Sequence, residues 1–312
     1  MQALVIAHRG ASGYLPEHTL AAKTLAHEMG ADYLEQDVVA SLDDELVVLH
    51  DIFLDRVSDV ASRFEGRERN DGRFYVRDFS LEELRSLHIW ERMNIDGTPI
   101  FPGRYPPRTG EFNIHTLAEE IELTQRLNQE SGKQVGIYPE IKRPAWHRQE
   151  GVDIAPRLLG TLADYGYKTK EDRVFIQCFD DAEIHRLRHG LNCPFRLVQL
   201  IGDNSWLEAA TDYDSLRSAN GIRRIAESAD AIGPDISHLY ELQKTEGVPV
   251  STGLAGLAHD NGLLVHPYTF RADDIPPGFA SFEELVRYFV ADIGVDGLFT
   301  DFPDRVLELR LP

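Results

Sequence analysis

The chain has few cysteines, no long apolar run and a deficit of positive charge. Its 312 residues include only two cysteines, Cys178 and Cys193, which match no metal-binding spacing and are expected to be reduced thiols. No apolar run approaches the roughly 20 residues that cross a bilayer, so no membrane anchor is expected. A formal net charge of −20 argues against nucleic-acid binding, which depends on Lys and Arg neutralising phosphates. These features favour a soluble globular protein in which an anionic substrate must meet a locally positive site.

The amino-terminal segment bears on the expected compartment. Residues 1–7 are too short for a signal peptide and lead directly into a histidine motif. The chain as given is therefore expected to be cytoplasmic, and periplasmic if a leader has been removed. Nothing in the sequence indicates an oligomeric state.

Short β-rich apolar runs alternate with helical stretches, which predicts parallel strands joined by helices. The eight runs are Ala3–His8, Asp32–Val38, Gln134–Ile141, Arg173–Cys178, Phe195–Leu200, Asp230–Gly233, Gly262–His266 and Asp296–Thr300. Helices beginning near Ser, Thr or Asp caps are expected at Thr19–Met29, Thr116–Glu130, Asp180–Arg188 and Phe282–Ile293. The predicted fold is therefore α/β, a (β/α)8 TIM barrel.

Two segments depart from this alternation. Leu46–Leu49 follows the second run too soon for a crossover helix, so it is expected to fold back as an antiparallel hairpin strand. Residues 52–114 contain many Gly and Pro residues, and their arginines nearly match their acidic residues in number. We expect this range to be an inserted subdomain over the barrel mouth that restricts which substrates enter, since loops on that face set specificity in barrel enzymes.

The strand ends, where barrel enzymes place their chemistry, are unusually polar. The polar residues at these positions are His8, Arg9, Glu35, Asp37, Glu140, Lys142, Gln177, His266, Tyr268, Thr300 and Asp301. We expect Gln177 and Tyr268 to contribute to substrate binding, whereas a structural role for His266 is equally compatible with its position.

Glu35 and Asp37 lie two residues apart on one strand, so both side chains leave the same face. Two inward carboxylates repel each other unless a cation lies between them. A hairpin turn centred on Asp43 and Asp44 would pair Asp37 with His50, which brings a histidine to this face. Glu140 and Lys142 share a face by the same two-residue rule. The set describes a hard-metal site suited to a phosphate ester.

Five ordered motifs carry a resemblance to a known family. They are HRG at His8, the segment PEHT at Pro16, the pair Glu35-x-Asp37 followed by His50-Asp51, the segment YPEIK at Tyr138 and the segment GLFTDFP at Gly297. This pattern resembles that of the glycerophosphodiester phosphodiesterases, in particular their bacterial periplasmic-type subgroup. That resemblance implies hydrolysis of the diester bond of deacylated phospholipids, with a small glycerophosphodiester as the substrate.

The resemblance also implies roles for individual residues. Glu35, Asp37 and Glu140 would bind one divalent cation, Ca²⁺ or Mg²⁺, which agrees with a ligand set made only of oxygens. His8 and His50 would act as the acid–base pair, and Arg9 and Lys142 would contact the phosphate. His18, by contrast, is expected to help cap the helix that begins near Thr19.

Two other functions remain open at this level. A phospholipase D-like or phosphoinositide-specific barrel would share paired histidines and a metal, but such enzymes act at membranes, and no polybasic or amphipathic anchor is evident. A barrel that only binds a phosphodiester would be expected to lack at least one catalytic position, and none is missing here.

Overall fold

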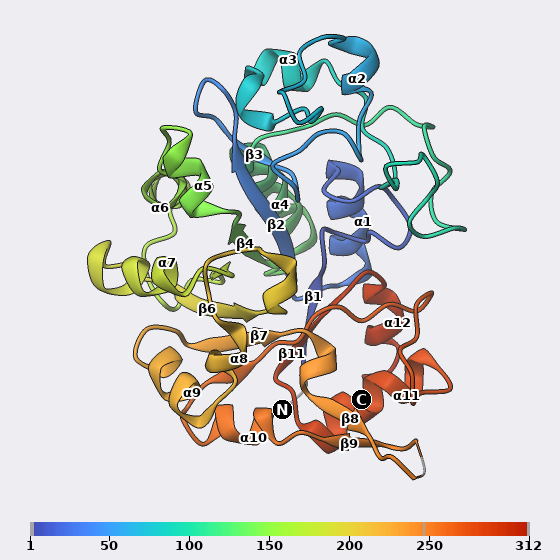
Figure 1. The fold of residues 1–312 in the computed structure, drawn as a ribbon, viewed down its shortest axis with the longest axis vertical. Helices are drawn as coiled ribbons and strands as arrows, with labels where there is room; N and C mark the ends of the chain where they lie inside the picture. The colour runs from blue at the N-terminus through green and yellow to red at the C-terminus, as the bar shows by residue number, and fades with distance from the viewer. Residues whose placement is uncertain (1–2, 246, 311–312) are drawn as a thin grey trace.

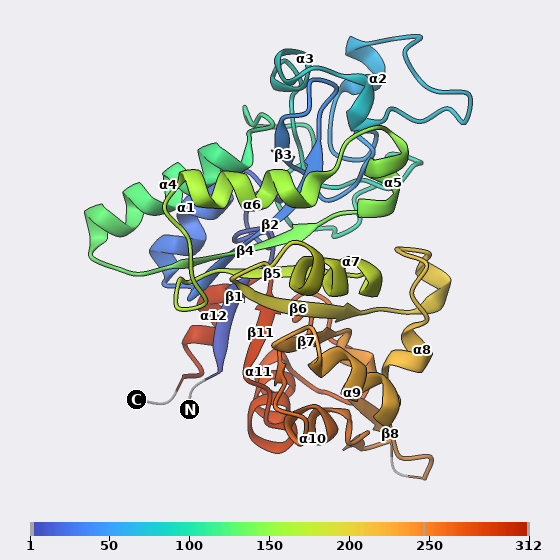
Figure 2. The same cartoon turned by 90° about the vertical axis from the view of Figure 1, so that its left-hand side faces the viewer.

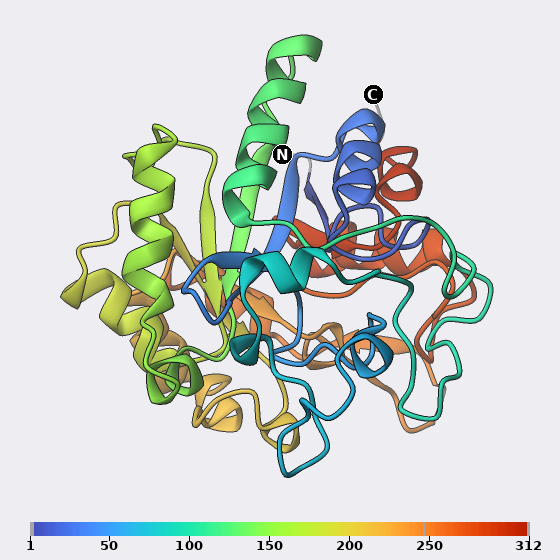
Figure 3. The same cartoon turned by 90° about the horizontal axis from the view of Figure 1, so that it is seen from above.

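The computed structural model describes residues 3–245 and 247–310. Eight parallel strands form a nearly closed barrel in the order β10-β7-β6-β5-β4-β2-β1-β11, with helices around it (Figures 1 and 3). They are β1 (Leu4–Ala7), β2 (Tyr33–Ala40), β4 (Gly136–Ile141), β5 (Phe175–Cys178), β6 (Arg196–Ile201), β7 (Ala231–Pro234), β10 (Leu264–Val265) and β11 (Gly297–Thr300). Backbone bonds from Asp296 N to the Val265 oxygen and from Phe299 N to the Pro267 oxygen, both 3.0 Å, join β11 to the β10 segment. All eight predicted strands are present, which confirms the TIM barrel.

The outer layer consists of helices, and the four expected from the sequence begin at side-chain caps. The helices are α1 (Leu20–Met29), α4 (Leu117–Ser131), α5 (Pro144–Gln149), α6 (Ile154–Asp164), α7 (Asp181–His185) with η2 (Arg186–Gly190), α8 (Tyr213–Leu216), α9 (Ala219–Ala226), α10 (Leu254–His259), α11 (Phe282–Arg287) with η5 (Tyr288–Ile293), and α12 (Pro303–Leu307). Thr19, Thr116, Asp180 and Ser281 each accept a hydrogen bond from the first turn of the helix that follows. These caps satisfy backbone N–H groups that have no partner within the helix, so the four helix starts expected from the sequence are confirmed.

The amino-terminal end of the barrel interior is filled by aromatic and aliphatic side chains. Tyr138 stacks on Phe175 with ring centroids 4.9 Å apart and meets the edge of Phe299 at 5.0 Å. Gly136 is needed in this layer, because a β-carbon there would lie 2.6 Å from the Arg173 carbonyl oxygen and closer still to the Tyr33 ring. The packed interior closes the barrel below its carboxyl end, where the polar residues gather.

The hairpin strand β3 (Leu46–Val48) pairs with β2 in antiparallel fashion as expected, but the predicted register is wrong. Val38 pairs with Val48 and Ala40 with Leu46, one residue away from the register that sets Asp37 opposite His50. The reason is the loop: Ser41 N bonds to the Glu45 oxygen across three residues, with Asp44 in the left-handed conformation, instead of across two. His50 nevertheless reaches the polar end of the barrel, because β3 ends at Val48 and the chain bends before His50.

Residues 52–114 carry three short helices, α2 (Val60–Arg63), η1 (Val76–Asp78) and α3 (Leu81–Arg85), beyond the ends of β2 and β3 (Figures 1 and 2). They have their own apolar cluster, which also includes side chains of the hairpin. Its buried members are Val39, Val47, Leu49, Ile52, Leu54, Val57, Val60, Phe74, Val76, Phe79, Leu84, Leu87, Ile89 and Ile114. Because the cluster contains residues of β2 and β3, the inserted range is packed onto the hairpin.

Three further features complete the fold. A second hairpin, β8 (Tyr240–Leu242) and β9 (Pro249–Ser251), follows β7, with η3 (Asn204–Trp206) and η4 (Ile236–His238) in neighbouring loops; the sequence analysis did not predict it. Cys178 and Cys193 are buried free thiols, as expected. Among the described residues, no helix has the length and apolar character needed to cross a membrane.

The Gly136→Ala substitution tests the packing of the barrel interior. The added methyl group collides with the Arg173 carbonyl, so we expect a loss of about 1–3 kcal/mol in the free energy of unfolding. Gly160→Ala is the matched control, because Gly160 lies on an exposed face of α6 and a β-carbon added there would have no neighbouring atom within 4 Å. That variant is expected to gain about 0.5–1 kcal/mol from helix propensity. Urea denaturation of both variants checks this, and equal stabilities would contradict it.

Candidate active site

A cavity of about 340 Å³ opens at the carboxyl ends of the barrel strands. It brings together all nine site residues predicted from the sequence, namely His8, Arg9, Glu35, Asp37, His50, Glu140, Lys142, Gln177 and Tyr268. These residues come from β2, β4 and β5 and from the segments that follow β1, β3, β4 and β10. His266 is not among the lining residues; its Nδ1 lies 2.9 Å from the Tyr138 hydroxyl within the packed interior.

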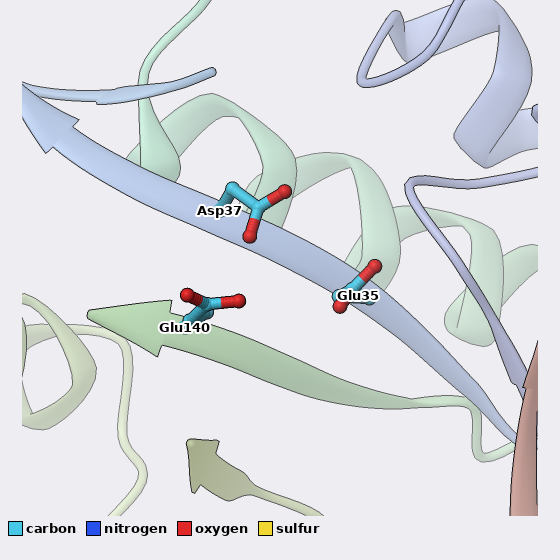
Figure 4. A group of neighbouring side chains, drawn as sticks. All are labelled: Glu35, Asp37 and Glu140. Atoms are coloured by element: carbon cyan, nitrogen blue, oxygen red, sulfur yellow. The ribbon is translucent and has the colours of Figure 1, made fainter. Parts of the chain in front are cut away.

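Three buried carboxylates face one another in this cavity. Glu35 and Asp37 stand on β2, and the sheet register sets Asp37 beside Glu140 on β4 (Figure 4). One oxygen from each lies within 4.8 Å of the others. Asp37 Oδ1 has no hydrogen-bond partner in the described part of the chain. A cluster of oxygen donors with a free buried lone pair fits a hard divalent cation, so the residues present are compatible with the metal that the sequence predicts.

The electrostatics of the cluster show how strongly its carboxylates oppose one another's ionisation. Burial, and then the charge of Asp37, raises the pKa of Glu35 to about 8. Burial also raises the pKa of Glu140 well above its usual value, although Lys142 opposes the shift. Burial alone would raise the pKa of Asp37 too, but Lys142, His18 and His50 hold it well below its usual value. The three groups therefore cannot all be ionised near neutral pH unless further positive charge is present.

Neighbouring groups fix the direction of each carboxylate. Glu35 accepts hydrogen bonds from the backbone N–H of Arg9 at 2.8 Å and from Gln177 Nε2 at 2.9 Å. Glu140 accepts from Lys142 Nζ at 2.8 Å, and that ammonium lies 4.0 Å from Asp37 Oδ1. Gln177 and Lys142 thus contact the acids directly while they line the cavity.

His8 and His50 are each held by a carboxylate at Nδ1. Asp301 Oδ1 lies 2.6 Å from His8 Nδ1, and Asp51 Oδ1 lies 2.6 Å from His50 Nδ1. This pairing fixes the tautomer that leaves Nε2 free to exchange a proton. Burial, with a further contribution from Arg9, lowers the pKa of His8 to about 4 and of His50 to about 3. Both imidazoles are therefore neutral near pH 7.

Arg9 and Tyr268 line the cavity and are also bonded to the protein. Arg9 Nη1 donates to Glu17 at 2.7 Å, and its Nε lies 3.6 Å from Asp37. The Tyr268 hydroxyl donates to the Ile201 carbonyl at 3.1 Å, and its ring meets the edge of Phe179.

Several contacts of the site were not predicted from the sequence, and the expectation for one residue was wrong. Thr19 caps α1, whereas His18 Nε2 lies 2.6 Å from Asp37 Oδ2, so the expected capping role of His18 is incorrect. The pairing of Asp51 and Asp301 with the two histidines was not predicted. Asp51 follows His50 in the chain, which is a usable signal, whereas Asp301 directly follows the eighth barrel strand and only closure of the barrel brings it beside His8.

Comparison with known proteins agrees with these motifs. The glycerophosphoryl diester phosphodiesterase family model matches residues 8–305. A glycerophosphodiester phosphodiesterase of Haemophilus influenzae is 41% identical, over 98% of this chain and 89% of its own length. A glycerophosphodiester phosphodiesterase of Treponema pallidum is 36% identical, over 96% of this chain and 90% of its own length.

Solved structures share the fold. A glycerophosphodiester phosphodiesterase from Agrobacterium tumefaciens aligns with a TM-score of 0.63 at 20% identity, over 98% of this chain and all of that one. An Oleispira antarctica phosphodiesterase, solved in complex with the product sn-glycerol-3-phosphate, aligns with a TM-score of 0.64 at 20% identity. The alignment covers 98% of this chain and 96% of that one.

The chain belongs to the glycerophosphoryl diester phosphodiesterase family. It is therefore an enzyme, a phosphoric diester hydrolase built on a TIM barrel.

Cation binding is expected to depend on pH, because a carboxylate must lose its proton to act as a ligand. With the pKa of Glu35 at about 8, Ca²⁺ and Mg²⁺ should bind roughly tenfold or more weakly at about pH 6.5 than at about pH 8.5. Calorimetric titration at the two pH values, in buffers of different ionisation enthalpy, measures both the affinity and the proton released. Glu35→Gln should bind more weakly and lose the part of the pH dependence that Glu35 contributes, while the raised pKa of Glu140 preserves the rest. An affinity that is the same at both pH values would contradict the assignment.

Proposed function

We propose that this enzyme hydrolyses glycerophosphodiesters to glycerol 3-phosphate and an alcohol, using one divalent cation and two histidines. The observation that carries the proposal is the convergence, in one cavity, of three buried carboxylates with two neutral imidazoles, each bound at Nδ1 by an aspartate. The product bound to the Oleispira antarctica relative supports glycerol 3-phosphate as the product here.

In this proposal Glu35, Asp37 and Glu140 hold Ca²⁺ or Mg²⁺. The cation would supply positive charge for the phosphate oxygens as negative charge develops on them during the reaction. Arg9 and Lys142 border the same space and would contact the remaining phosphate oxygens. An Arg fork beside an ammonium suits an anionic diester, which the net charge of −20 would otherwise repel.

His8 and His50 divide the proton transfers. One imidazole takes the proton of the attacking oxygen, from water or from the adjacent glycerol hydroxyl, through Nε2. The other gives a proton to the departing alkoxide and must therefore be protonated when substrate is bound, which the negative charge of the phosphate favours because an opposite charge raises the pKa of a nearby imidazole. Asp301 and Asp51 stabilise whichever imidazole becomes charged, because each already accepts from Nδ1. Gln177 orients Glu35, and Tyr268 lines the wall of the substrate pocket.

The proposal that residues 52–114 restrict the substrate stays a prediction. None of the residues that line the main cavity comes from this range. Side chains of the range do lie beside it, in a small adjoining space bordered by Glu91, Arg92, Phe101 and Arg104.

His8→Ala and His50→Ala are each expected to lower kcat by at least about 10²-fold, because one proton transfer loses its donor or acceptor. Circular dichroism should show both variants folded, since each histidine lines the open cavity and is not part of the apolar core. His266→Ala serves as a control for loss of a buried histidine, because His266 does not line the cavity. If either active-site variant keeps most of its wild-type kcat, that histidine does not transfer a proton.

Chelation tests the requirement for a metal. Wild-type enzyme treated with EDTA should lose turnover of glycerophosphocholine, glycerophosphoethanolamine, glycerophosphoglycerol and glycerophosphoinositol, and added Ca²⁺ or Mg²⁺ should restore it. Undiminished activity in chelator would refute the metal-dependent mechanism. Binding of these diesters without turnover under any metal condition would instead indicate a barrel that only binds its ligand.

A further inference from the structure

The same three-residue arrangement occurs at both histidines, and in each case its outer member is an arginine of the inserted range. Asp51 uses Oδ1 for His50 and Oδ2 for Arg92 Nη1, at 2.6 and 2.5 Å. Asp301 uses Oδ1 for His8 and Oδ2 for Arg104 Nη2, at 2.6 and 2.7 Å. Each aspartate thus bridges one barrel histidine and one arginine that lies between residues 52 and 114.

Both arginines are buried and multiply bonded, which sets them apart from surface ion pairs. The side chains of Arg92 and Arg104 are only 8% and 5% exposed. Arg92 also donates to both oxygens of Glu17, at 2.5 and 3.0 Å, and Glu17 accepts from Arg9 Nη1 at 2.7 Å. The Arg92 guanidinium therefore connects the Asp51 carboxylate, through Glu17, with Arg9, the residue proposed to contact the phosphate.

The backbone of the inserted range holds Arg92 in place. Met93 N donates to the Arg56 carbonyl at 2.9 Å, and Arg56 Nε returns a bond to the Met93 carbonyl at 2.9 Å. Trp90 N donates to the Val57 carbonyl at 2.9 Å. The segment that carries Arg92 is thus fastened to the chain that leaves the barrel just after Asp51.

We propose that the inserted range is part of the catalytic machinery: Arg92 and Arg104 are positioning residues that lock the carboxylates of Asp51 and Asp301 against His50 and His8. This inference rests on the proposed role of the two histidines. This function of the insertion differs from restricting the size of the substrate. The two arginines act on the histidines through Asp51 and Asp301 and do not need to touch the substrate.

The physical reason is that a carboxylate bonded through one oxygen can still rotate and tilt. An ion pair at the second oxygen removes that freedom, so Oδ1 stays directed at Nδ1 and Nε2 stays directed into the cavity. The arginine also offsets the cost of burying an aspartate beside a neutral imidazole. A small misplacement of a reacting group is enough to slow catalysis substantially.

The two arrangements differ in redundancy, which makes the inference specific. Asp301 Oδ2 accepts a second bond, from Arg271 Nε at 2.9 Å, so the loss of Arg104 leaves one guanidinium in place. Within the described part of the chain, Arg92 is the one hydrogen-bond donor to Asp51 Oδ2. Loss of Arg92 should therefore impair catalysis more than loss of Arg104.

The experiment compares Arg92→Gln and Arg104→Gln with Arg77→Gln in the full-length enzyme, using glycerophosphocholine and saturating Ca²⁺ or Mg²⁺. Arg77 is a matched control: it is a buried arginine of the same inserted range that pairs with Asp44 at 2.9 Å, away from the cavity. Arg92→Gln is expected to lower kcat roughly tenfold to a hundredfold with KM within about threefold of wild type. Arg104→Gln should lose less, and Arg77→Gln should keep its kcat.

Restoring a positive charge at position 92 distinguishes a role of Arg92 in positioning Asp51 from a role in folding. Arg92→Lys should retain more activity than Arg92→Gln, and added guanidinium should partly restore the kcat of Arg92→Ala but not that of His50→Ala. If Arg92→Gln does not fold, the lysine variant and the rescue of Arg92→Ala supply the same comparison.

Two results would overturn the inference while the proposed function stands: Arg92→Gln as active as Arg77→Gln, or a loss confined to KM. A wild-type enzyme that turns over none of the glycerophosphodiesters would instead overturn the proposed function itself. The outcomes of the two proposals are therefore distinguishable in one set of assays.

Discussion

The crowding of Glu35, Asp37 and Glu140 is the constraint on which the rest of this structure depends. Strands β2 and β4 are adjacent and in register, so their three carboxylates lie in one buried space. One oxygen atom of each carboxylate lies within 4.8 Å of an oxygen of the other two. Such a group is unstable unless positive charge surrounds it. Lys142 supplies part of that charge, the backbone N–H of Arg9 and the imidazole of His18 add hydrogen bonds to the carboxylates, and a divalent cation would supply the remaining charge.

The surrounding ion pairs form layers around this centre. The innermost groups touch the carboxylates, the histidines lie beside them, and Asp51 and Asp301 lie behind the histidines. Arg92 and Arg104 of the inserted range form the outermost layer. These arginines offset the charge of the buried aspartates behind the histidines, in a chain whose net charge is −20.

Much of this arrangement could be predicted from the sequence, because it follows from short-range rules. Strand periodicity placed the eight barrel strands, and the two-residue spacing of Glu35 and Asp37 placed both acids on one face. The hairpin register was wrong because a three-residue loop cannot be distinguished from a two-residue turn when Leu42, Asp43 and Asp44 all suit a turn. One shifted residue reverses the face of every paired side chain, yet His50 reached the site because pairing ends before it.

The long-range contacts lay beyond sequence reasoning. His8 and Asp301 are separated by 293 positions and Asp301 and Arg104 by 197, and no local pattern specifies which arginine of the inserted range meets which aspartate. His18 was misjudged for a related reason. Its position beside Thr19 suggests a helix cap, whereas its actual partner, Asp37, is brought near only when α1 packs on β2.

Anomalous diffraction from crystals soaked in Mn²⁺ is the most direct measurement of whether the three carboxylates form one cation site. The predicted result is a single strong peak with oxygens of Glu35, Asp37 and Glu140 at about 2.0–2.6 Å, and with Nε2 of His8 and His50 facing the same space. A peak bound elsewhere, or carboxylates that separate by more than about 8 Å and leave no peak between them, would contradict it.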